Sequence, residues 1–185
     1  MTIYRKLLPT EHPQYAEHLL RLSPADRYAR FAGTVSDATI RRHCAKLDWT
    51  RTTLIGAFHN GRLVGAAEVC TDRALWPGAA ELALSVDVAA QGCGVGGQLA
   101  RRALTWARNR NILQAHMLCL AGNHRMRALA RRFGGAIEMD AGEVAIVFNL
   151  PAPNQFSLAL EALEDGAGVI TSVLDVMQTA RAVAA

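Results

Sequence analysis

The sequence has no acidic residue between Asp87 and Glu138, although Asp and Glu side chains are spread over the rest of the chain. The same stretch is rich in arginine and contains Arg101, Arg102, Arg108, Arg110, Arg125, Arg127, Arg131 and Arg132. Cations without neighbouring anions produce a positive potential. This region therefore predicts a polyanionic ligand, which is either a phosphorylated small molecule or a nucleic acid.

Aromatic side chains are scarce, at 6% of the chain, and no stacking aromatics are interleaved with these arginines. Proteins that bind single-stranded nucleic acids combine basic grooves with aromatic stacking platforms. Trp106 falls on the apolar stripe of a predicted helix, so we assign it to the core. A nucleic-acid partner is therefore not expected, and the potential favours a phosphorylated cofactor.

Long apolar runs and paired cysteines are also missing. No run approaches the roughly 18 residues of a membrane-spanning helix, and the first six residues lack the apolar centre of a signal peptide. The four cysteines lie far apart, without the spacing of a metal site or a disulfide framework. We therefore expect reduced thiols, a cytoplasmic location, no membrane partner and no metal.

The chain is long and apolar enough for one domain with its own core, at 185 residues and 51% hydrophobic composition. Asn60-Gly61 between two alternating apolar runs predicts a β-hairpin. The expected elements are a strand at 2–8, helices at 13–22, from Ser23-Pro24 and from Ser36 or Asp37 to about 47, strands at 52–59, 62–70 and 80–88, a helix to about 110, a strand at 112–120, a helix capped by Asn123, and strands at 135–140 and 143–149. This order predicts an α/β fold, with a mixed, mostly antiparallel central sheet flanked by helices.

The last part of the chain differs in composition and predicts a helical hairpin after the domain of residues 1–150. Two apolar stripes at helical spacing, separated by Gly166 and Gly168, are Phe156, Ala159, Leu160 and Leu163, and then Ile170, Val173, Met177 and Ala180. We expect residues 151–185 to pack on the domain or on a partner chain, which allows a homodimer through these helices.

Four glycines within six residues follow the strand predicted at 80–88 and open a helix. Such a loop directs several backbone N–H groups at one point, and the helix dipole adds positive potential there. The P-loop is excluded because no Gly-Lys pair exists. Gly92, Gly94 and Gly97 match the dinucleotide fingerprint, but the acidic residue that it needs about 20 positions later is missing. An arginine could instead serve a 2′-phosphate, which leaves NADP disfavoured and not excluded.

The run from Val86 to Gly96, with Gln91 before the first glycine, resembles the acetyl-CoA motif of the GNAT superfamily of N-acetyltransferases. The segment from Asn123 to Gly134 looks like the second landmark of that superfamily, and the element order over about 2–150 is similar as well. Residues 22–31, which contain the pattern Ser-Pro-x-x-Arg-Tyr-x-Arg-Phe, are similar to the branch that contains bacterial protein-lysine acetyltransferases.

The resemblance implies an acyl-CoA-dependent N-acyltransferase with acetyl-CoA as co-substrate. The residues that it assigns to the cofactor are Val86, Val88, Gln91, Gly92, Gly94, Val95, Gly96, Gly97, Asn123 and Arg131. Backbone N–H groups of residues 91–97 would hold the pyrophosphate, while Val86 and Val88 would pair with the pantetheine arm like an added strand. Arg131 or Arg132 would meet the 3′-phosphate.

Acetyl transfer to a primary amine, on a small molecule or a protein lysine, needs an unprotonated nucleophile and so a general base. Glu81, at the start of the strand that leads to the loop, is the first candidate, and Glu68 is the second. Ala130 stands where many members carry the tyrosine that protonates the leaving thiolate, so water or Tyr28 would have to substitute. The alternative function is a regulatory module that binds CoA or acyl-CoA without catalysis.

Overall fold

The computed structural model describes residues 1–71, 78–140 and 143–168. Within them, one seven-stranded sheet has the order β1-β2-β3-β4-β5-β7-β6. The strands are β1 (Thr2–Lys6), β2 (Thr52–His59), β3 (Arg62–Thr71), β4 (Ala79–Val86), β5 (Gln114–Leu120), β6 (Ala136–Asp140) and β7 (Glu143–Asn149). Neighbouring strands are antiparallel except for the parallel pair β4 and β5. The predicted mixed, mostly antiparallel sheet is therefore confirmed.

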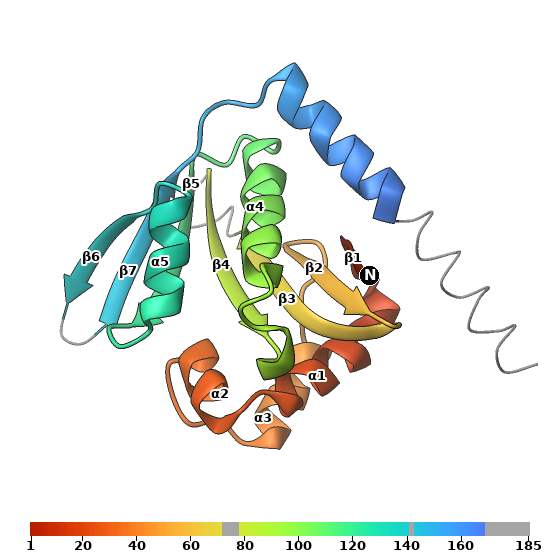
Figure 1. The fold of residues 1–185 in the computed structure, drawn as a ribbon, viewed down its shortest axis with the longest axis vertical. Helices are drawn as coiled ribbons and strands as arrows, with labels where there is room; N and C mark the ends of the chain where they lie inside the picture. The colour runs from red at the N-terminus through yellow and green to blue at the C-terminus, as the bar shows by residue number, and fades with distance from the viewer. Residues whose placement is uncertain (72–77, 141–142, 169–185) are drawn as a thin grey trace, which may run out of the picture.

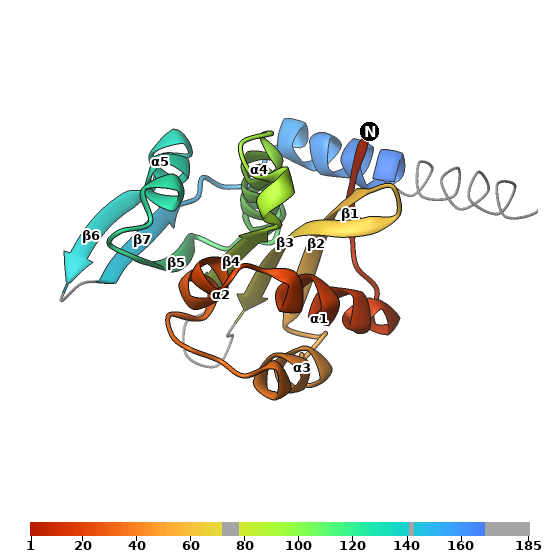
Figure 2. The same ribbon diagram turned by 60° about the horizontal axis from the view of Figure 1, so that its bottom comes forward.

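Helices cover both faces of this sheet. They are η1 (Pro9–Glu11), α1 (His12–Arg21), α2 (Pro24–Phe31), α3 (Asp37–Ala45), η2 (Val88–Ala90), α4 (Val95–Arg108), α5 (His124–Arg132) and a C-terminal helix over 155–168. Figures 1 and 2 show α1, α2 and α3 on one face, and α4, α5 and the C-terminal helix on the other. The sheet thus separates two layers that contribute different parts of the site.

Local sequence signals explain several of these elements. Asn60 and Gly61 adopt left-handed φ values of 50° and 72°, as the tight turn between β2 and β3 requires. The side chains of Ser23, Ser36 and Asn123 each accept a hydrogen bond from a backbone N–H in the first turn of α2, α3 and α5, respectively. The hairpin and all three helix starts agree with the sequence predictions.

Two predicted strands end earlier in the structure than expected. The first strand stops at Lys6, and β4 stops at Val86 before the chain turns into η2. The prediction that Val88 continues the strand is wrong, since Val88 starts η2 and its carbonyl accepts a hydrogen bond from the Gln91 N–H. The apolar alternation alone did not reveal this turn.

The hydrophobic core has one cluster on each face of the sheet. The larger cluster packs α4 against the centre of the sheet, with Leu99 and Ala103 almost fully buried. The smaller cluster packs α1 and α3 against the first strands through Tyr15, Leu19 and Ile40. Trp106 belongs to the larger cluster, as the sequence predicted. Both helical layers are therefore fixed to the sheet by apolar packing.

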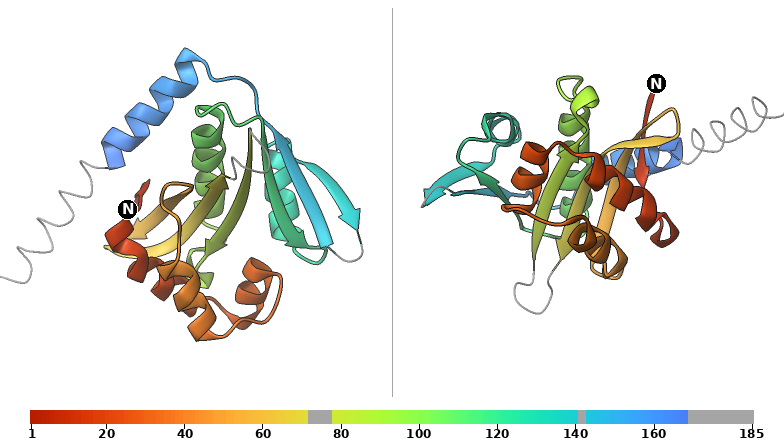
Figure 3. Two further views of the ribbon diagram at one scale, coloured as in Figure 1. Left: turned by 180° about the vertical axis from the view of Figure 1, so that it is seen from behind. Right: turned by 90° about the horizontal axis from the view of Figure 1, so that it is seen from below.

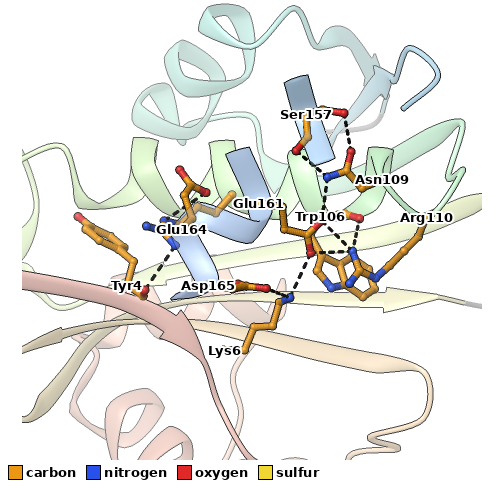
Figure 4. A network of polar contacts seen from close by, with 10 residues as sticks. Tyr4, Lys6, Trp106, Asn109, Arg110, Ser157, Glu161, Glu164 and Asp165 are labelled. Atoms are coloured by element: carbon orange, nitrogen blue, oxygen red, sulfur yellow. Dashed lines mark hydrogen bonds and ion pairs between the residues drawn. The ribbon is translucent and has the colours of Figure 1, made fainter. Parts of the chain in front are cut away.

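The C-terminal helix is attached through its polar side (Figure 4). Glu161 Oε2 accepts a hydrogen bond from Asn109 Nδ2 at 2.8 Å, and Asp165 Oδ2 pairs with Lys6 Nζ at 2.6 Å. Glu164 pairs with Arg101 and lies 3.8 Å from Arg102 Nε. These contacts join the helix to β1 and α4 by charge and hydrogen bonding.

The apolar side of the same helix faces solvent, with Phe156 77% and Leu163 72% exposed. Residues 151–185 were expected to pack on the domain or on a partner chain; the helix over 155–168 lies on the domain through its polar side, while Phe156 and Leu163 of the stripe are exposed. The helix also continues through Gly166, where a break was expected. The second stripe, from Ile170 to Ala180, lies outside the described residues.

Candidate active site

The glycine loop between β4 and α4 owes its shape to backbone conformation. Gly92 and Gly94 have φ values of 77° and 82°, a region that side chains with a Cβ rarely adopt. A Cβ built on either residue would meet nothing within 4 Å. Glycine is thus required at these two positions for the path of the chain, while the space above them stays open to a ligand.

Six consecutive backbone N–H groups, from Gly92 to Gly97, donate no hydrogen bond within the described part of the chain. Gly94 is the N-cap of α4, and no side chain of the described residues caps that helix end. The first turn of α4 also contains no acidic residue. The unpaired N–H groups and the dipole of this 14-residue helix together give this helix end the positive potential that favours an anion.

Arginines from α5 add positive charge beside this loop. Arg132 Nη1 lies 3.5 Å from the position that a Cβ of Gly97 would take. Arg125 donates a hydrogen bond to the side-chain carbonyl of Gln91. Arg131 and Arg132 are both exposed on α5, and of the two it is Arg132 that lies beside Gly97 of the loop. The sequence could not choose between these neighbours.

Gln91 connects the loop to three other segments. Its Nε2 donates to the Val86 carbonyl at 3.0 Å and to Asp26 Oδ2 of α2 at 3.2 Å, while its carbonyl accepts from Arg125 of α5. Asn123, also predicted at this site, uses its side-chain oxygen to cap α5 through the Met126 N–H at 3.1 Å. Gln91 and Asn123 therefore fix the frame around the loop.

The two central parallel strands diverge beside the loop. β4 pairs with β5 only from Ala79 to Glu81, opposite Gln114 to His116. From Leu82 to Val86, the edge of β4 that faces β5 has no partner strand among the residues that the structure describes, and Figure 3 shows the widening gap from behind. An open strand edge can accept an extended amide-containing ligand. Val86 ends this open edge, directly before the glycine loop.

A buried polar group on the other face positions the end of β4. His18 of α1 is fully buried, and its Nε2 lies 2.9 Å from Ser85 Oγ while its Nδ1 lies 2.8 Å from Asp87 Oδ1. Arg21 Nη2 lies 3.4 Å from Asp87 Oδ2. Although burial opposes ionisation, His18 and Arg21 lower the pKa of Asp87. No local sequence signal predicts this group, because two helices and two strands separate α1 from β4 along the chain.

Glu81 lies in a row of side chains across four strands on the α1–α3 face. Thr52 of β2 is opposite Cys70 of β3, Cys70 is opposite Glu81 of β4, and Glu81 is opposite His116 of β5. Glu81 and His116 are exposed, and Cys70 is half-buried. The first candidate base therefore has access to solvent at the point where β4 and β5 begin to separate.

Glu68, the second candidate base, lies two residues before Cys70 on β3 and is largely buried. Its Oε2 accepts hydrogen bonds from Tyr15 Oη at 2.7 Å and Arg30 Nη2 at 2.6 Å, and lies 3.1 Å from His43 Nε2. Burial opposes ionisation, but His43 and Arg30 outweigh it and lower the pKa of Glu68 to about 2. An oxygen with three partners and so low a pKa is a weak proton acceptor at neutral pH.

The position expected to hold a leaving-group acid is apolar. Ala130 is 1% exposed and belongs to the larger core cluster. Tyr28 is 45% exposed on α2, a helix that contacts both β4 and β5. Tyr28 is thus on the helix next to the gap between these strands.

The described residues contain no group of three or more His, Cys, Asp and Glu side chains arranged to hold a metal. Among the helices of the described residues, none is long and apolar enough to cross a membrane.

Comparisons with known proteins find a matching family and similar folds. Residues 15–135 fit the model of the Acetyltransferase (GNAT) family. The GNAT domain of S. lividans PAT superposes with a TM-score of 0.69 at 21% identity, covering 80% of this chain and 89% of that one. The ribosomal-protein-S18-alanine N-acetyltransferase from Escherichia coli gives 0.62 at 20% identity, with 83% and 96% coverage. The Thermoplasma acidophilum paia N-acetyltransferase, solved in complex with coenzyme A, gives 0.61 at 16% identity, with 80% and 99% coverage.

Proposed function

The chain belongs to the GNAT family of acetyltransferases, and from this premise we propose that it moves an acetyl group from acetyl-CoA to a primary amine by direct attack in a ternary complex. The observation that supports this most is the row of unpaired N–H groups from Gly92 to Gly97 beside the open edge of β4. The unpaired N–H groups suit a pyrophosphate, and the open edge of β4 suits the amide-containing arm that joins the pyrophosphate to the thioester.

The loop residues fit the donor as follows. The N–H groups of residues 92–97 hold the pyrophosphate, and Arg132 is the better placed partner for the 3′-phosphate. Val95 contributes its backbone only, because its side chain is 4% exposed in the core. The open edge from Leu82 to Val86 receives the pantetheine arm, and one of its N–H groups stabilises negative charge on the thioester oxygen.

Glu81 acts as the general base, directly or through water. The amine nitrogen attacks the acetyl carbonyl carbon, the carbon–sulfur bond breaks, and the proton of the amine passes to the Glu81 carboxylate. Exposure lets this carboxylate return the proton to solvent. Glu68 is assigned a structural role, because Arg30 and His43 hold it in the ionised form.

The thiolate leaves without an acid at Ala130. A thiol with an ordinary pKa of about 8.5 is a tolerable leaving group, so the loss slows the reaction modestly. Water or Tyr28 completes the protonation. The apolar environment of Ala130 also favours the alternative that the protein binds acetyl-CoA without catalysis.

Calorimetry with acetyl-CoA, followed by thiol release in the presence of a panel of amines and lysine peptides, tests both functions. Glu81→Gln should lower turnover by about 100-fold or more without weakening acetyl-CoA binding. Glu138→Gln, at an exposed acid on β6, is the matched control. Binding without turnover of any acceptor would support the regulatory module, and absence of binding would exclude both functions.

We also propose that residues 1–150 form the transferase domain and that 151–185 form an appendage that joins two copies. Within 155–168 the acidic side chains Glu161, Glu164 and Asp165 all pair with the domain. The exposed side therefore carries an apolar stripe and no charge that would oppose a second, identical stripe. We expect a dimeric mass in solution that becomes monomeric in Phe156→Glu/Leu163→Glu, and a monomeric wild type would exclude the dimer.

The four free cysteines fit a reducing compartment such as the cytoplasm.

A further inference from the structure

A hollow of about 510 Å³ opens on the α1–α3 face, beside the row that contains Glu81. Its walls come from α3, from the segment that follows α3, and from the ends of β2 and β3. Glu68 and Cys70 form part of its lining on the β3 side, and Arg42 and Lys46 form part of it on the α3 side. The hollow therefore has an inner wall near the sheet and an outer wall of cations.

The two outer cations have no ion-pair partner within the described residues. Arg42 and Lys46 are both exposed on or just after α3, four residues apart on the same side. Asp48, the acid on the same wall, accepts hydrogen bonds from the Thr50 N–H at 2.9 Å and Thr50 Oγ1 at 2.6 Å. These bonds lower its pKa and hold it within its own turn. The outer wall is thus positive and has spare hydrogen-bond donors.

On the inner wall, the negative charge of Glu68 is balanced by a cation of the protein itself. Glu68 shares its charge with the buried guanidinium of Arg30, and all three of its polar contacts are made by Oε2. Glu68 Oε1 accepts no hydrogen bond within the described part of the chain, so one acceptor stays available at the sheet side. The hollow therefore offers an acceptor at its inner end and two cations at its outer end.

Strand register connects the hollow to the proposed base. Thr52 and Cys70 line the hollow, and Cys70 is directly opposite Glu81. Neighbouring strands lie about 4.8 Å apart, so Glu81 is roughly 10 Å from Thr52, two strands away. A molecule of this length with its amine at Glu81 would place its other end in the hollow.

We propose that the acceptor is a small amine with an anionic group, a carboxylate or a phosphate, which Arg42 and Lys46 bind in this hollow. The inference rests on the proposed acetyl transfer and names its substrate class. Charge-assisted hydrogen bonds to the anion orient the chain of the acceptor so that the amine reaches Glu81. A protein lysine surrounded by neutral or cationic residues has no anionic group for these two cations to bind.

Rates of thiol release with matched acceptors test the inference. We would compare ω-amino carboxylates of three to eight carbons, the amino alcohols of equal length, and the phosphate esters of those alcohols. The anionic acceptors should exceed the alcohols in kcat/KM by at least about tenfold, the scale of one charge-assisted contact. The acceptor class with the higher kcat/KM, carboxylates or phosphate esters, identifies the anionic group of the acceptor.

The double variant Arg42→Gln/Lys46→Gln should remove this preference and leave the rates with amino alcohols unchanged. Arg41→Gln is the matched control, because Arg41 is an exposed arginine of α3 that does not line the hollow. Equal rates with acids and alcohols, an unchanged preference in the double variant, or acetylation of lysine peptides alone would overturn the inference.

Failure of acetyl transfer itself is distinguishable. If acetyl-CoA binds but no amine is acetylated, binding of 6-aminohexanoate and of inorganic phosphate is measured by calorimetry in the presence of acetyl-CoA. Binding of either probe that is lost in the double variant supports the hollow as an anion site, although the proposed transfer then fails. Absence of binding by both probes overturns the inference as well.

Discussion

The two faces of the sheet differ in where their polar groups come from. On the α4–α5 face, the loop from Gly92 to Gly97 uses backbone N–H groups, positive φ values and a helix dipole, with few side chains involved. On the α1–α3 face, the polar chemistry belongs to side chains such as Glu68, Arg30 and Glu81. Backbone features of this kind leave a local sequence signature, whereas a side-chain cluster depends on which distant residues the fold brings together.

The largest effect is expected on the α1–α3 face, where Arg30→Met leaves the buried Glu68 carboxylate without its guanidinium partner. An uncompensated buried charge costs about 3–5 kcal/mol, so the free energy of unfolding should fall by that amount. Urea denaturation measures it. The double variant Arg30→Met/Glu68→Met should recover most of the loss, since apolar side chains of similar size can replace a buried ion pair. A single variant as stable as the wild type would show that the cluster is not a structural unit.

The same cluster predicts a dependence of stability on pH. The pKa of Glu68 is about 2 in the folded protein, below its ordinary value of 4.5, so its ionisation favours the folded state. This contribution is complete above about pH 4.5 and is lost as the pH falls through 2, with a total on the order of 3 kcal/mol. The free energy of unfolding, measured by urea denaturation between pH 5 and 2, should fall less steeply with decreasing pH in Glu68→Gln than in the wild type. Equal slopes would mean that Glu68 is not held in its ionised form.

Local signals allowed the sequence to predict most of the fold. The Asn60-Gly61 turn, the three helix caps and the glycine loop each depend on residues within a few positions of one another. The contacts around Glu68 could not be predicted, because Tyr15, Arg30 and His43 come from three different helices. The choice of Arg132 over Arg131 also required the structure, since one residue along a helix turns the side chain by about 100°.

On the α4–α5 face, replacing both Gly92 and Gly94 by valine should weaken acetyl-CoA binding by about 100-fold. A β-branched side chain at positive φ is strongly disfavoured, so the loop would lose the conformation that aligns its N–H groups. Calorimetry measures the affinity. Gly122→Val is the control, because Gly122 has equally open surroundings and no positive φ. If the double variant and the control bind acetyl-CoA alike, the loop does not hold the donor.

The smallest effect concerns a polar contact group that links the end of β4 to α1. Asp87→Asn should keep the shape of this side chain while weakening its hold on His18 and Arg21, which come from α1 on the other face. Asp87 directly follows Val86 and precedes the loop, so a looser Asp87 lets the end of β4 shift. We expect an acetyl-CoA affinity that is about three- to tenfold lower, since small displacements of positioning groups have effects of this size or larger. Arg62→Gln is the control, because Arg62 is 3.9 Å from Asp87 and largely exposed, and should change the affinity little. A loss of stability with unchanged affinity would instead show that α1 supports the fold alone, and that the glycine loop is independent of the α1–α3 face, on which we propose that the acceptor binds.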